Sequence, residues 1–397
     1  MKPRLLVILL LLLGSCHSSQ IRSIEFNFGE YEFEHEIDQL FTATKDGGLA
    51  ATRYSFVGAH RKAINALSAN ADTIDRISEK NWNQIKENHT FYKATDQIIL
   101  EAEKYNWVLI NEAHAVPQHR NFVRRLLPAL ATLGFKYLAL EAISMTSKGQ
   151  QYDTEITNRG YPTTRSGFYT KEPEFGNLIR DAVKHGFKII GYDQGSGEER
   201  EIMGAQNILK QIEADGKRGK TLVLCGWDHI KEGETGTYWE YALAGRLKKF
   251  TGEDPLTINQ TQYYERSQSV YEDSIFQHVN VDAPMVLLNK KGESFDVETN
   301  TEWYDAFVFH PRTKYTDGFP NWLVQTNPLV SIKLPKIAME CPCKLFLYAQ
   351  NDDISKAVPL YIHEVNTIER RLSLPMKKGE KYKLVISNKD ISYLLEP

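Results

Sequence analysis

The chain has 397 residues, of which 25% are charged and 42% are hydrophobic, and its formal net charge is −3 at pH 7. This composition suits a globular protein with one large core and an appendage. The near-neutral charge provides no basic field, so we expect no nucleic-acid partner. Apart from Cys16 only Cys225, Cys341 and Cys343 occur, and their spacing forms no disulfide framework.

The first residues have the pattern of an export signal. An unbroken apolar run from Leu5 to Leu13 follows two basic residues and precedes Gly-Ser-Cys16. The run is too short to span a bilayer but suits the hydrophobic region of a signal peptide. Leu-Gly-Ser-Cys looks like a bacterial lipobox, so we predict that residues 1–20 are a lipoprotein signal and tether. A lipid on Cys16 would anchor the protein to a membrane of the bacterial cell envelope, on the periplasmic side or at the outer membrane. An ordinary signal peptide cleaved nearby is the alternative, and it also predicts export.

Residues 21–104 are predicted to form an N-terminal helical region. Apolar residues recur there in interrupted patterns, for example at Ile64, Leu67, Ile74 and Ile77. This spacing favours helices, which we expect to form a layer or lid beside the main core.

The segment from Trp107 to Ala142 predicts a strand, a helix and a second strand. Its apolar runs, Trp-Val-Leu-Ile and Tyr-Leu-Ala-Leu, are typical of parallel strands buried on both faces. Between them, apolar residues at three- and four-residue steps give a helix one packing stripe. Pro117 lies near the start of this helix and Gly134 just past its end, the favoured place of each.

Ionisable residues lie at the carboxyl ends of these two strands: Glu112 and His114 after the first, Glu141 after the second. A right-handed crossover puts both ends on one edge of the sheet, where open α/β proteins bind ligands. The segment Gly-Phe-Lys-Ile-Ile-Gly-Tyr-Asp193 matches Gly-Phe-Lys-Tyr-Leu-Ala-Leu-Glu141 in position. We therefore predict that Glu141 and Asp193 lie on adjacent or near-adjacent strands and face the same cleft.

Helices and strands continue to alternate up to residue 320, which predicts a mainly parallel sheet. Helices are expected from Glu174, from a capping box at 196–199 and from another at 237–240. Strands are expected at 221–225, 256–259 and 304–309. The first delivers Gly-Trp-Asp-His229, the second ends in Asn259, and the third delivers His310 and Arg312.

Beyond residue 320, short alternating apolar runs separated by turns predict a small all-β appendage. The overall expectation is an α/β fold with a mainly parallel central sheet flanked by helices, an N-terminal helical layer and this appendage. The boundaries are 21–104 for the helical region, 105–320 for the core and 321–397 for the β-rich domain. Within the last, Cys341-Pro342-Cys343 allows a redox pair or soft metal ligands. Packed thiols are favoured, because no second cysteine pair is present.

The residues expected at the rim share one chemistry. Histidines and carboxylates are the ligand types of zinc, manganese or iron sites that keep open positions. A bound metal would lower the pKa of its water, whereas without a metal a His and a Glu can activate water as general bases. The catalytic candidates are Glu112, His114, Glu141 and His229, and the last three are also the candidate metal ligands.

Neighbouring residues are candidates for substrate binding: Asp193, Arg200, Asn259, His310 and Arg312. Arg200 could orient a carboxylate or clamp an anion, and a solvated surface arginine is the alternative. His119 lies in the first turn of its helix near the rim, where a cap or packing role is as suitable as a site role.

At these residues the sequence resembles the Tiki/TraB superfamily, which includes erythromycin-esterase-like hydrolases and haem-uptake lipoproteins. The resemblance covers residues 95–265 and rests on three short motifs, Glu112-Ala-His114, the segment that ends in Leu-Glu141-Ala, and Gly226-Trp-Asp-His229. It implies functional roles for Glu112, His114, Glu141 and His229, in hydrolysis or in haem uptake.

We therefore predict an envelope-anchored hydrolase that acts on an ester or amide of a small-molecule or peptide substrate, either metal-assisted or with His and Glu as general bases. A lipoprotein that binds haem or a metal without catalysis is the alternative. Haem ligation needs an apolar slot beside the histidine, for which Trp107, Tyr192 and Trp227 are candidates. An inactive scaffold that uses its β appendage for contacts is a third possibility.

Overall fold

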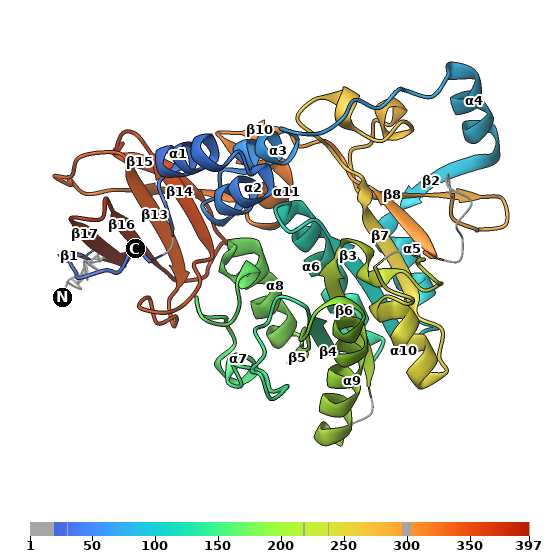
Figure 1. The fold of residues 1–397 in the computed structure, drawn as a ribbon. Helices are drawn as coiled ribbons and strands as arrows, with labels where there is room; N and C mark the ends of the chain where they lie inside the picture. The colour runs from blue at the N-terminus through green and yellow to red at the C-terminus, as the bar shows by residue number, and fades with distance from the viewer. Residues whose placement is uncertain (1–19, 30, 217–218, 237, 296–302, 397) are drawn as a thin grey trace, which may run out of the picture.

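The structure, a computed structural model, describes residues 20–29, 31–216, 219–236, 238–295 and 303–396. Two sheets dominate these residues, a mainly parallel one of eight strands and an antiparallel one of five. Figure 1 shows the two sheets on opposite sides of the molecule, with α1, α2 and α3 above their junction. The predicted α/β class with a β-rich C-terminal part is confirmed.

The large sheet has a parallel centre. From β9 to β5 all neighbours are parallel, whereas β8 runs antiparallel to both β9 and β2. The central strand is β3, which lies between β6 and β7. In spatial order the strands are β2 (His89–Lys93), β8 (Met285–Asn289), β9 (Ala306–Phe309), β7 (Leu256–Tyr263), β3 (Trp107–Glu112), β6 (Lys220–Gly226), β4 (Phe135–Leu140) and β5 (Lys188–Gly191).

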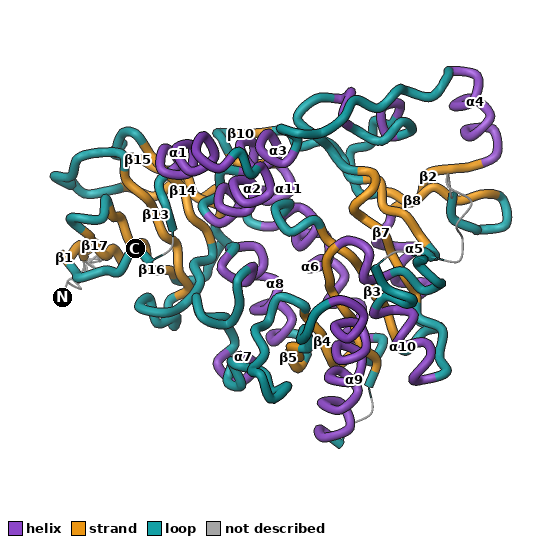
Figure 2. Tube along the Cα trace, in the orientation of Figure 1, coloured by secondary structure: helices purple, strands orange, loops and turns teal. Residues whose placement is uncertain are grey.

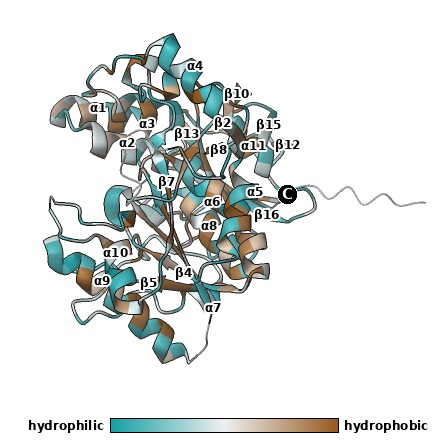
Figure 3. Ribbon diagram, turned by 90° about the vertical axis from the view of Figure 1, so that its right-hand side faces the viewer, coloured by the Kyte–Doolittle hydropathy of each residue, from teal (hydrophilic) through white to brown (hydrophobic). Residues whose placement is uncertain are grey.

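Helices cover both faces of this sheet. α5 (Ala94–Ala102), α6 (Pro117–Thr132) and α8 (Pro173–Lys184) pack on one face, and α9 (Gly197–Asp215) and α10 (Leu243–Thr251) pack on the other. Alternate residues of β3 point to opposite faces of the sheet. Val108 and Ile110 pack in the core with the first group of helices, and Trp107 and Leu109 pack in the core with the second group. The apolar strands therefore lie inside and polar helix surfaces outside, as the colours of Figure 3 show.

The N-terminal helices belong with the C-terminal β region. α1 (Glu34–Thr44), α2 (Gly47–Phe56) and α3 (His60–Leu67) share a core with Phe346 and Tyr348 of the five-stranded sheet. α4 (Glu79–Asn88) leads into β2, which joins the large sheet beside β8. Region 21–104 is therefore mainly helical as predicted. It also contains β2, an edge strand that is too exposed to show an apolar run.

The five-stranded sheet has the order β1-β17-β16-β13-β14. Its first strand is N-terminal, because β1 pairs antiparallel with β17 and sets Ile21 opposite Leu395. The chain therefore joins this sheet at a point where we had expected the end of a tether. The elements of this region are β1 (Gln20–Ser23), β10 (Tyr315–Thr316), β11 (Phe319–Pro320), α11 (Asn321–Thr326), β12 (Leu329–Lys333), β13 (Cys343–Ala349), β14 (Tyr361–Val365), β15 (Arg371–Pro375), β16 (Tyr382–Ser387) and β17 (Ser392–Glu396).

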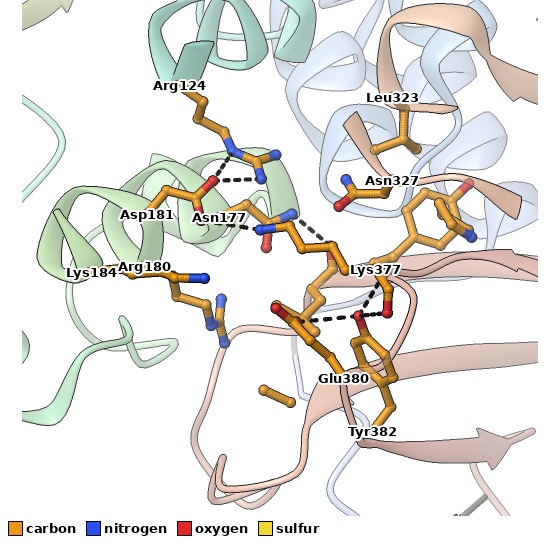
Figure 4. A pocket seen from close by; sticks show the side chains of 14 residues that line it. Arg124, Asn177, Arg180, Asp181, Lys184, Leu323, Asn327, Lys377, Glu380 and Tyr382 are labelled. Carbon is orange, nitrogen blue, oxygen red and sulfur yellow. Dashed lines mark hydrogen bonds and ion pairs between the residues drawn. The ribbon is translucent and has the colours of Figure 1, made fainter. Parts of the chain in front are cut away.

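Ion pairs join the parallel-sheet core to the C-terminal region around a cavity of about 150 Å³ (Figure 4). Asp181 of α8 accepts from Arg124 of α6 at 3.0 and 2.8 Å, and the Lys377 Nζ lies 3.4 Å from its other oxygen. Arg180 donates to Asp352 at 2.7 Å. Since the Arg180–Asp352 pair joins the two parts and is largely buried, we infer that it helps to fix the orientation of one part relative to the other.

Two expected features of the helices differ from the structure. α10 begins at Leu243 rather than near residue 237. α9 begins after Ser196 as expected, but the Ser196 side chain makes no capping hydrogen bond. Among the described residues, no helix combines the length and apolarity needed to cross a membrane. Cys16 and the predicted signal segment lie outside the described residues.

Candidate functional site

The carboxyl ends of three adjacent strands carry the candidate residues. Glu112 ends β3 opposite Gly226, which ends β6, and Glu141 directly follows β4 on the other side of β6. The crossover argument is therefore confirmed for these strands, because their ends form one rim.

A buried carboxylate holds His114 in place. The His114 Nδ1 lies 3.0 Å from Glu112 Oε1. Arg120, in the first turn of α6, donates to the two oxygens of Glu112 at 2.6 and 2.7 Å and to the His114 carbonyl at 2.7 Å. Burial alone would raise the pKa of Glu112, but the charge of Arg120 and the bond to His114 outweigh it and lower this pKa to about 2. Glu112 is thus ionised and accepts the Nδ1 proton, which leaves the Nε2 lone pair free when the ring is neutral.

The connection between β4 and α8 is long and is mainly loop in Figure 2, apart from short helical segments such as α7 (Ile156–Arg159). It supplies the residue that stacks on the His114 ring. The short helix η1 (Tyr169–Lys171) brings the Tyr169 ring parallel to His114, with 4.0 Å between the ring centres. Glu172 then caps α8 through the backbone N–H groups of Glu174 and Phe175, and it accepts from Arg120 at 3.0 Å. Burial raises the pKa of Glu172 to about 7 in spite of the arginine.

A second buried carboxylate holds His229. This residue lies in η2 (Trp227–Ile230), the turn that follows β6. Its Nδ1 is 2.9 Å from Glu201 Oε2, which also accepts the backbone N–H of Leu243 at 2.8 Å. Trp239 stacks on the His229 ring with 4.9 Å between centres. Burial alone would lower the pKa of His229, but the bond to Glu201 and the charge of Glu141 outweigh it and raise this pKa.

Glu141 lies between the two histidines. Its Oε1 accepts from Arg200 at 2.7 Å and lies 3.8 Å from the His229 Nε2, while its Oε2 accepts the Gly226 N–H at 2.5 Å. Burial would raise the pKa of Glu141, but the charges of His229, His114 and Arg200 and the Gly226 N–H together lower it. The site therefore has an ionised carboxylate at its centre.

Arg200 links the two strands of the internal repeat. It donates to Asp193 at 2.6 and 2.9 Å and to Glu141 at 2.7 Å. β4 and β5 are adjacent, with Leu140 opposite Gly191. The prediction that Glu141 and Asp193 lie on adjacent strands is confirmed, and both side chains contact Arg200, which orients carboxylates rather than lying free at the surface.

Gly226 provides the room in which these groups meet. A Cβ atom at this position would lie 2.6 Å from both Nε2 and Cε1 of His114, and 3.3 Å from Glu141 Oε2. The Nε2 of His114 and the Glu141 carboxylate therefore border the same small space above Gly226. The backbone of Gly226 is extended, with φ −79°, so the glycine is needed for space and not for conformation.

Known proteins give little guidance on this site. No protein-family model matches the chain, and no curated protein matches it in sequence. Two solved structures resemble part of the chain. The type III effector HopBA1 is 14% identical over 42% of this chain and 82% of its own, with a TM-score of 0.31. RRSP, a MARTX toxin effector domain from Vibrio vulnificus CMCP6, is 17% identical over 50% of this chain and 44% of its own, with a TM-score of 0.29. At these TM-scores the likeness carries no argument, and the resemblance to the Tiki/TraB superfamily stays a prediction.

Three predicted substrate-binding residues lie away from the space above Gly226. Arg312 donates to Glu272 at 3.1 Å and to the Val279 carbonyl at 2.6 Å, so it fixes a loop. His310 is fully buried, and its Nε2 bonds to Gln260 at 3.0 Å. Asn259 lies within β7, which continues to Tyr263 instead of ending at Asn259 as predicted; its side chain accepts from Asn111 at 3.2 Å and is largely buried. We therefore assign substrate contact to none of the three.

Asn111 instead organises the backbone under the site. Its amide donates to the carbonyl of Trp227 at 2.9 Å, and its Oδ1 accepts the Gln260 N–H at 2.8 Å. Trp227 has φ +44°, a conformation that costs a non-glycine residue of order 1–3 kcal/mol. The hydrogen bond from Asn111 thus holds a strained turn that delivers His229.

His119 has a structural role that the sequence left open. Its Nδ1 accepts the Ala113 N–H at 3.0 Å, so its Nε2 carries the ring proton. His310 donates from Nε2 to Gln260, whose own amide nitrogen donates to the Asn111 carbonyl at 2.6 Å. The remaining ring nitrogens, His119 Nε2 and His310 Nδ1, have no hydrogen-bond partner among the described residues, and the ring centres are 5.0 Å apart. One is a donor and the other an acceptor, so they complement each other beneath the Glu112–His114 segment.

The three candidate metal ligands fit a divalent cation poorly. The Nε2 atoms of His114 and His229 are suitable, since metal-bound histidines usually donate their other N–H to a carboxylate. Glu141, however, already accepts from the Arg200 guanidinium, and this positive charge lies 2.7 Å from the oxygen nearest His229. Within the described residues, no group of three His, Cys, Asp or Glu side chains is arranged to hold a metal. We derive no step through a metal, and metal dependence stays a prediction.

The aromatic residues considered for a haem slot are also distributed differently. Trp107 and Tyr192 are packed in the core beneath α9 and α10, at 7% and 3% exposure. Only Trp227, at 39% exposure, lies open beside the rim. No apolar slot is therefore formed by these three residues together.

Sequence reasoning named Glu112 as a candidate but missed the other residues that hold the histidines. Arg120 did carry a signal, because it falls on the apolar stripe of its helix, three residues before Val123, where a charge is unexpected. Glu201 stands beside Ile202 at the edge of the α9 stripe and could have been noticed in the same way. Tyr169 and Trp239 lie in irregular connections, for which no periodic signal exists.

Proposed function

We propose that the protein hydrolyses an ester or amide bond, with His114 as general base and His229 as general acid beside Glu141. One observation carries the proposal. Each histidine donates its Nδ1–H to a buried carboxylate, and each Nε2 lies on the side of the ionised Glu141. Imidazoles held in one tautomer and directed at a common space are what acid–base catalysis requires.

In this proposal His114 activates water. His114 Nε2 and Glu141 Oε2 would lie 2.6 and 3.3 Å from a Cβ atom at Gly226, so both groups are close to one point, and we place the attacking water beside them. A water molecule there would give a proton to Nε2 while its oxygen forms a bond to the substrate carbonyl carbon. The imidazolium that results is stabilised by Glu112, which stays ionised because of Arg120.

His229 completes the reaction as the acid. Its raised pKa keeps a larger fraction of the ring protonated near neutral pH. As the tetrahedral intermediate collapses, Nε2–H gives its proton to the leaving oxygen or nitrogen and the C–O or C–N bond breaks. Arg200 keeps Glu141 in place and puts a positive charge near the developing oxyanion.

The surroundings of the site support a substrate with an apolar or planar part. Tyr169 and Trp239 flank the two histidines, and Trp227 is 39% exposed beside them. Aromatic rings of this kind bind apolar and planar groups through a large contact area. Both a small-molecule and a peptide substrate are compatible with this arrangement.

The test is a hydrolysis assay of the whole protein on a panel of aryl esters and peptide amides. His114→Ala, His229→Ala and Glu141→Gln should each lose activity by roughly 10²- to 10⁴-fold. His185→Ala, an exposed histidine at the end of α8, is the matched control and should keep the parent rate. A chelator arm measures metal dependence separately. If all three site variants kept the parent rate, the hydrolase assignment of this rim would fail.

The same preparations also test the binding alternative. A Soret band after haem titration that disappears in both His114→Ala and His229→Ala would favour haem binding over hydrolysis. We further propose that a lipid on Cys16 keeps the protein at the cell envelope, on the strength of the lipobox-like sequence alone.

A further inference from the structure

Two cysteines at the start of β13 are in direct contact. The Sγ atoms of Cys341 and Cys343 are 3.4 Å apart. Cys343 is fully buried and Cys341 is partly exposed. The sequence allowed a redox pair or soft metal ligands here and favoured packed thiols, and the direct contact of the two sulfurs brings the redox pair back into consideration.

The backbone around them is held by specific bonds. Cys343 pairs with Val365 in the β13–β14 ladder. The carbonyl of Glu340 accepts from the Cys343 thiol at 3.1 Å and from the Asn388 side chain at 3.1 Å. The two sulfurs therefore meet because the turn is fixed on both sides.

No other thiol of the described chain competes for this contact. Cys225 is buried in β6, inside the core between the large sheet and α9, whereas Cys343 belongs to the core of the C-terminal β region. The pairing of Cys341 with Cys343 is the one that the fold allows among the described residues.

We propose that Cys341 and Cys343 form a reversible dithiol–disulfide redox site that reacts with low-molecular-weight disulfides. The distance between the sulfurs must fall to the roughly 2.05 Å of an S–S bond. Rotation of the two side chains about χ1 can supply this change, and the thiol hydrogen bond of Cys343 to Glu340 is then given up.

The difference in exposure sets the order of the steps. Cys341 as the thiolate attacks one sulfur of the small disulfide and expels one thiolate, which leaves a mixed disulfide on Cys341. Cys343, after losing its proton, attacks the Cys341 Sγ and expels the second thiolate. In total, two protein thiols are oxidised to a disulfide and the small disulfide is reduced to two thiols. Burial and the adjacent Cys341 thiol raise the pKa of Cys343 to about 12, which agrees with Cys341 reacting first.

Exchange, rather than structural support, is the role that suits this pair. A disulfide stabilises a fold mainly by closing a long loop in the unfolded chain. Residues 341 and 343 are separated by one residue, so the closed loop is very short. Disulfides that are exposed or strained are the labile ones that react with thiols. We therefore expect little change in the thermal midpoint on oxidation.

The experiment uses the full chain with excess oxidised glutathione, followed by alkylation of free thiols under denaturing conditions and peptide mass mapping. The expected product is a peptide in which Cys341 and Cys343 are joined and unalkylated, and dithiothreitol should restore both alkylated residues. Cys343→Ser should stop at the glutathione adduct on Cys341. Cys341→Ser should form no adduct at the buried Cys343.

A Cys225→Ser variant is the matched control and should give the same oxidised peptide as the parent. The proposal is overturned if both residues of the parent remain alkylated after oxidation. It is equally overturned if the adduct on Cys341 persists in the parent without forming the internal bond, or if oxidation joins two chains instead.

Discussion

Replacing Gly226 by alanine tests the site at the point where its groups are closest. The added Cβ would lie 2.6 Å from Nε2 and Cε1 of His114, where ordinary contacts are 3.4–4 Å. The ring, or the end of β6, must therefore move by about 1 Å. The ring is held by the Glu112 bond at 3.0 Å and by the stack on Tyr169 at 4.0 Å, so its movement weakens one or both.

The size of the expected effect follows from this movement. A misplacement of about 1 Å of a catalytic group can lower the rate by roughly 100-fold. Overpacking of this kind usually costs about 1–3 kcal/mol of stability. Because the His114 side chain is 19% exposed, its ring can move toward solvent, which limits this cost. We therefore expect a much larger loss in kcat than in folded protein at assay temperature.

Hydrolysis rates and thermal unfolding of the same preparations separate the two effects. Gly48→Ala is the matched control, because its nearest added contact is Asp46 Oδ1 at 3.4 Å and the residue lies exposed in α2. It should leave both measurements close to those of the parent. A Gly226→Ala protein that is folded and hydrolyses at the parent rate would refute the idea that His114 Nε2 acts from the space above Gly226.

Three further predictions use other parts of the structure. Glu201→Gln replaces the charged partner of His229 by a neutral one, so the pKa of His229 should fall. The decrease of kcat/KM with rising pH should then begin at a lower pH than in the parent. An NMR titration of the His229 ring should show the same fall in pKa. His310 has its pKa lowered to about 3 by burial, so the folded state gives up stability as pH falls from 6.5 toward 3. His310→Gln should reduce the change in the free energy of unfolding with pH by up to about 1.4 kcal/mol per pH unit. Denaturant unfolding of parent and variant at pH 7 and pH 4.5 measures this free energy. Cys16→Ser should move the protein from the membrane to the soluble fraction, and unchanged membrane retention would rule out the lipid as the anchor.

The parallel centre of the fold was predictable because burial on both faces leaves a distinct mark in the sequence. β3, β4 and β6 each contain a buried run of four apolar residues, and the crossover rule then brings Glu112, Glu141 and His229 to one edge. The match between the segments that end in Glu141 and Asp193 correctly indicated that β4 and β5 are equivalent strands at one edge of the sheet. The observed register differs from the match by one residue, because Leu140 lies opposite Gly191 rather than Tyr192.

The strands and site residues that were not predicted depend on contacts between segments far apart in the chain. A single sequence carries no local signal for such contacts. β2 is an edge strand whose partner β8 lies almost 200 residues further along the chain, and β1 takes its partner from the opposite end of the described chain. For the site, the sequence named His114 and His229 but not the carboxylate that holds the second. Glu201 reaches His229 only after α9 has packed on the sheet.

The pairing of β1 with β17 has a consequence for the order of events during synthesis. Residues 20–23 are made before the rest of the described chain, but their partner strand ends at Glu396, so the five-stranded sheet cannot close until almost the whole chain has been made. Until then β1 and the edge of β16 remain unpaired, and open strand edges are where chains associate wrongly. A stalled or truncated chain that lacks residues 392–396 would leave both edges open at once. Such products should depend on chaperones or be degraded, even though the residues of the candidate site on the large sheet have already been made.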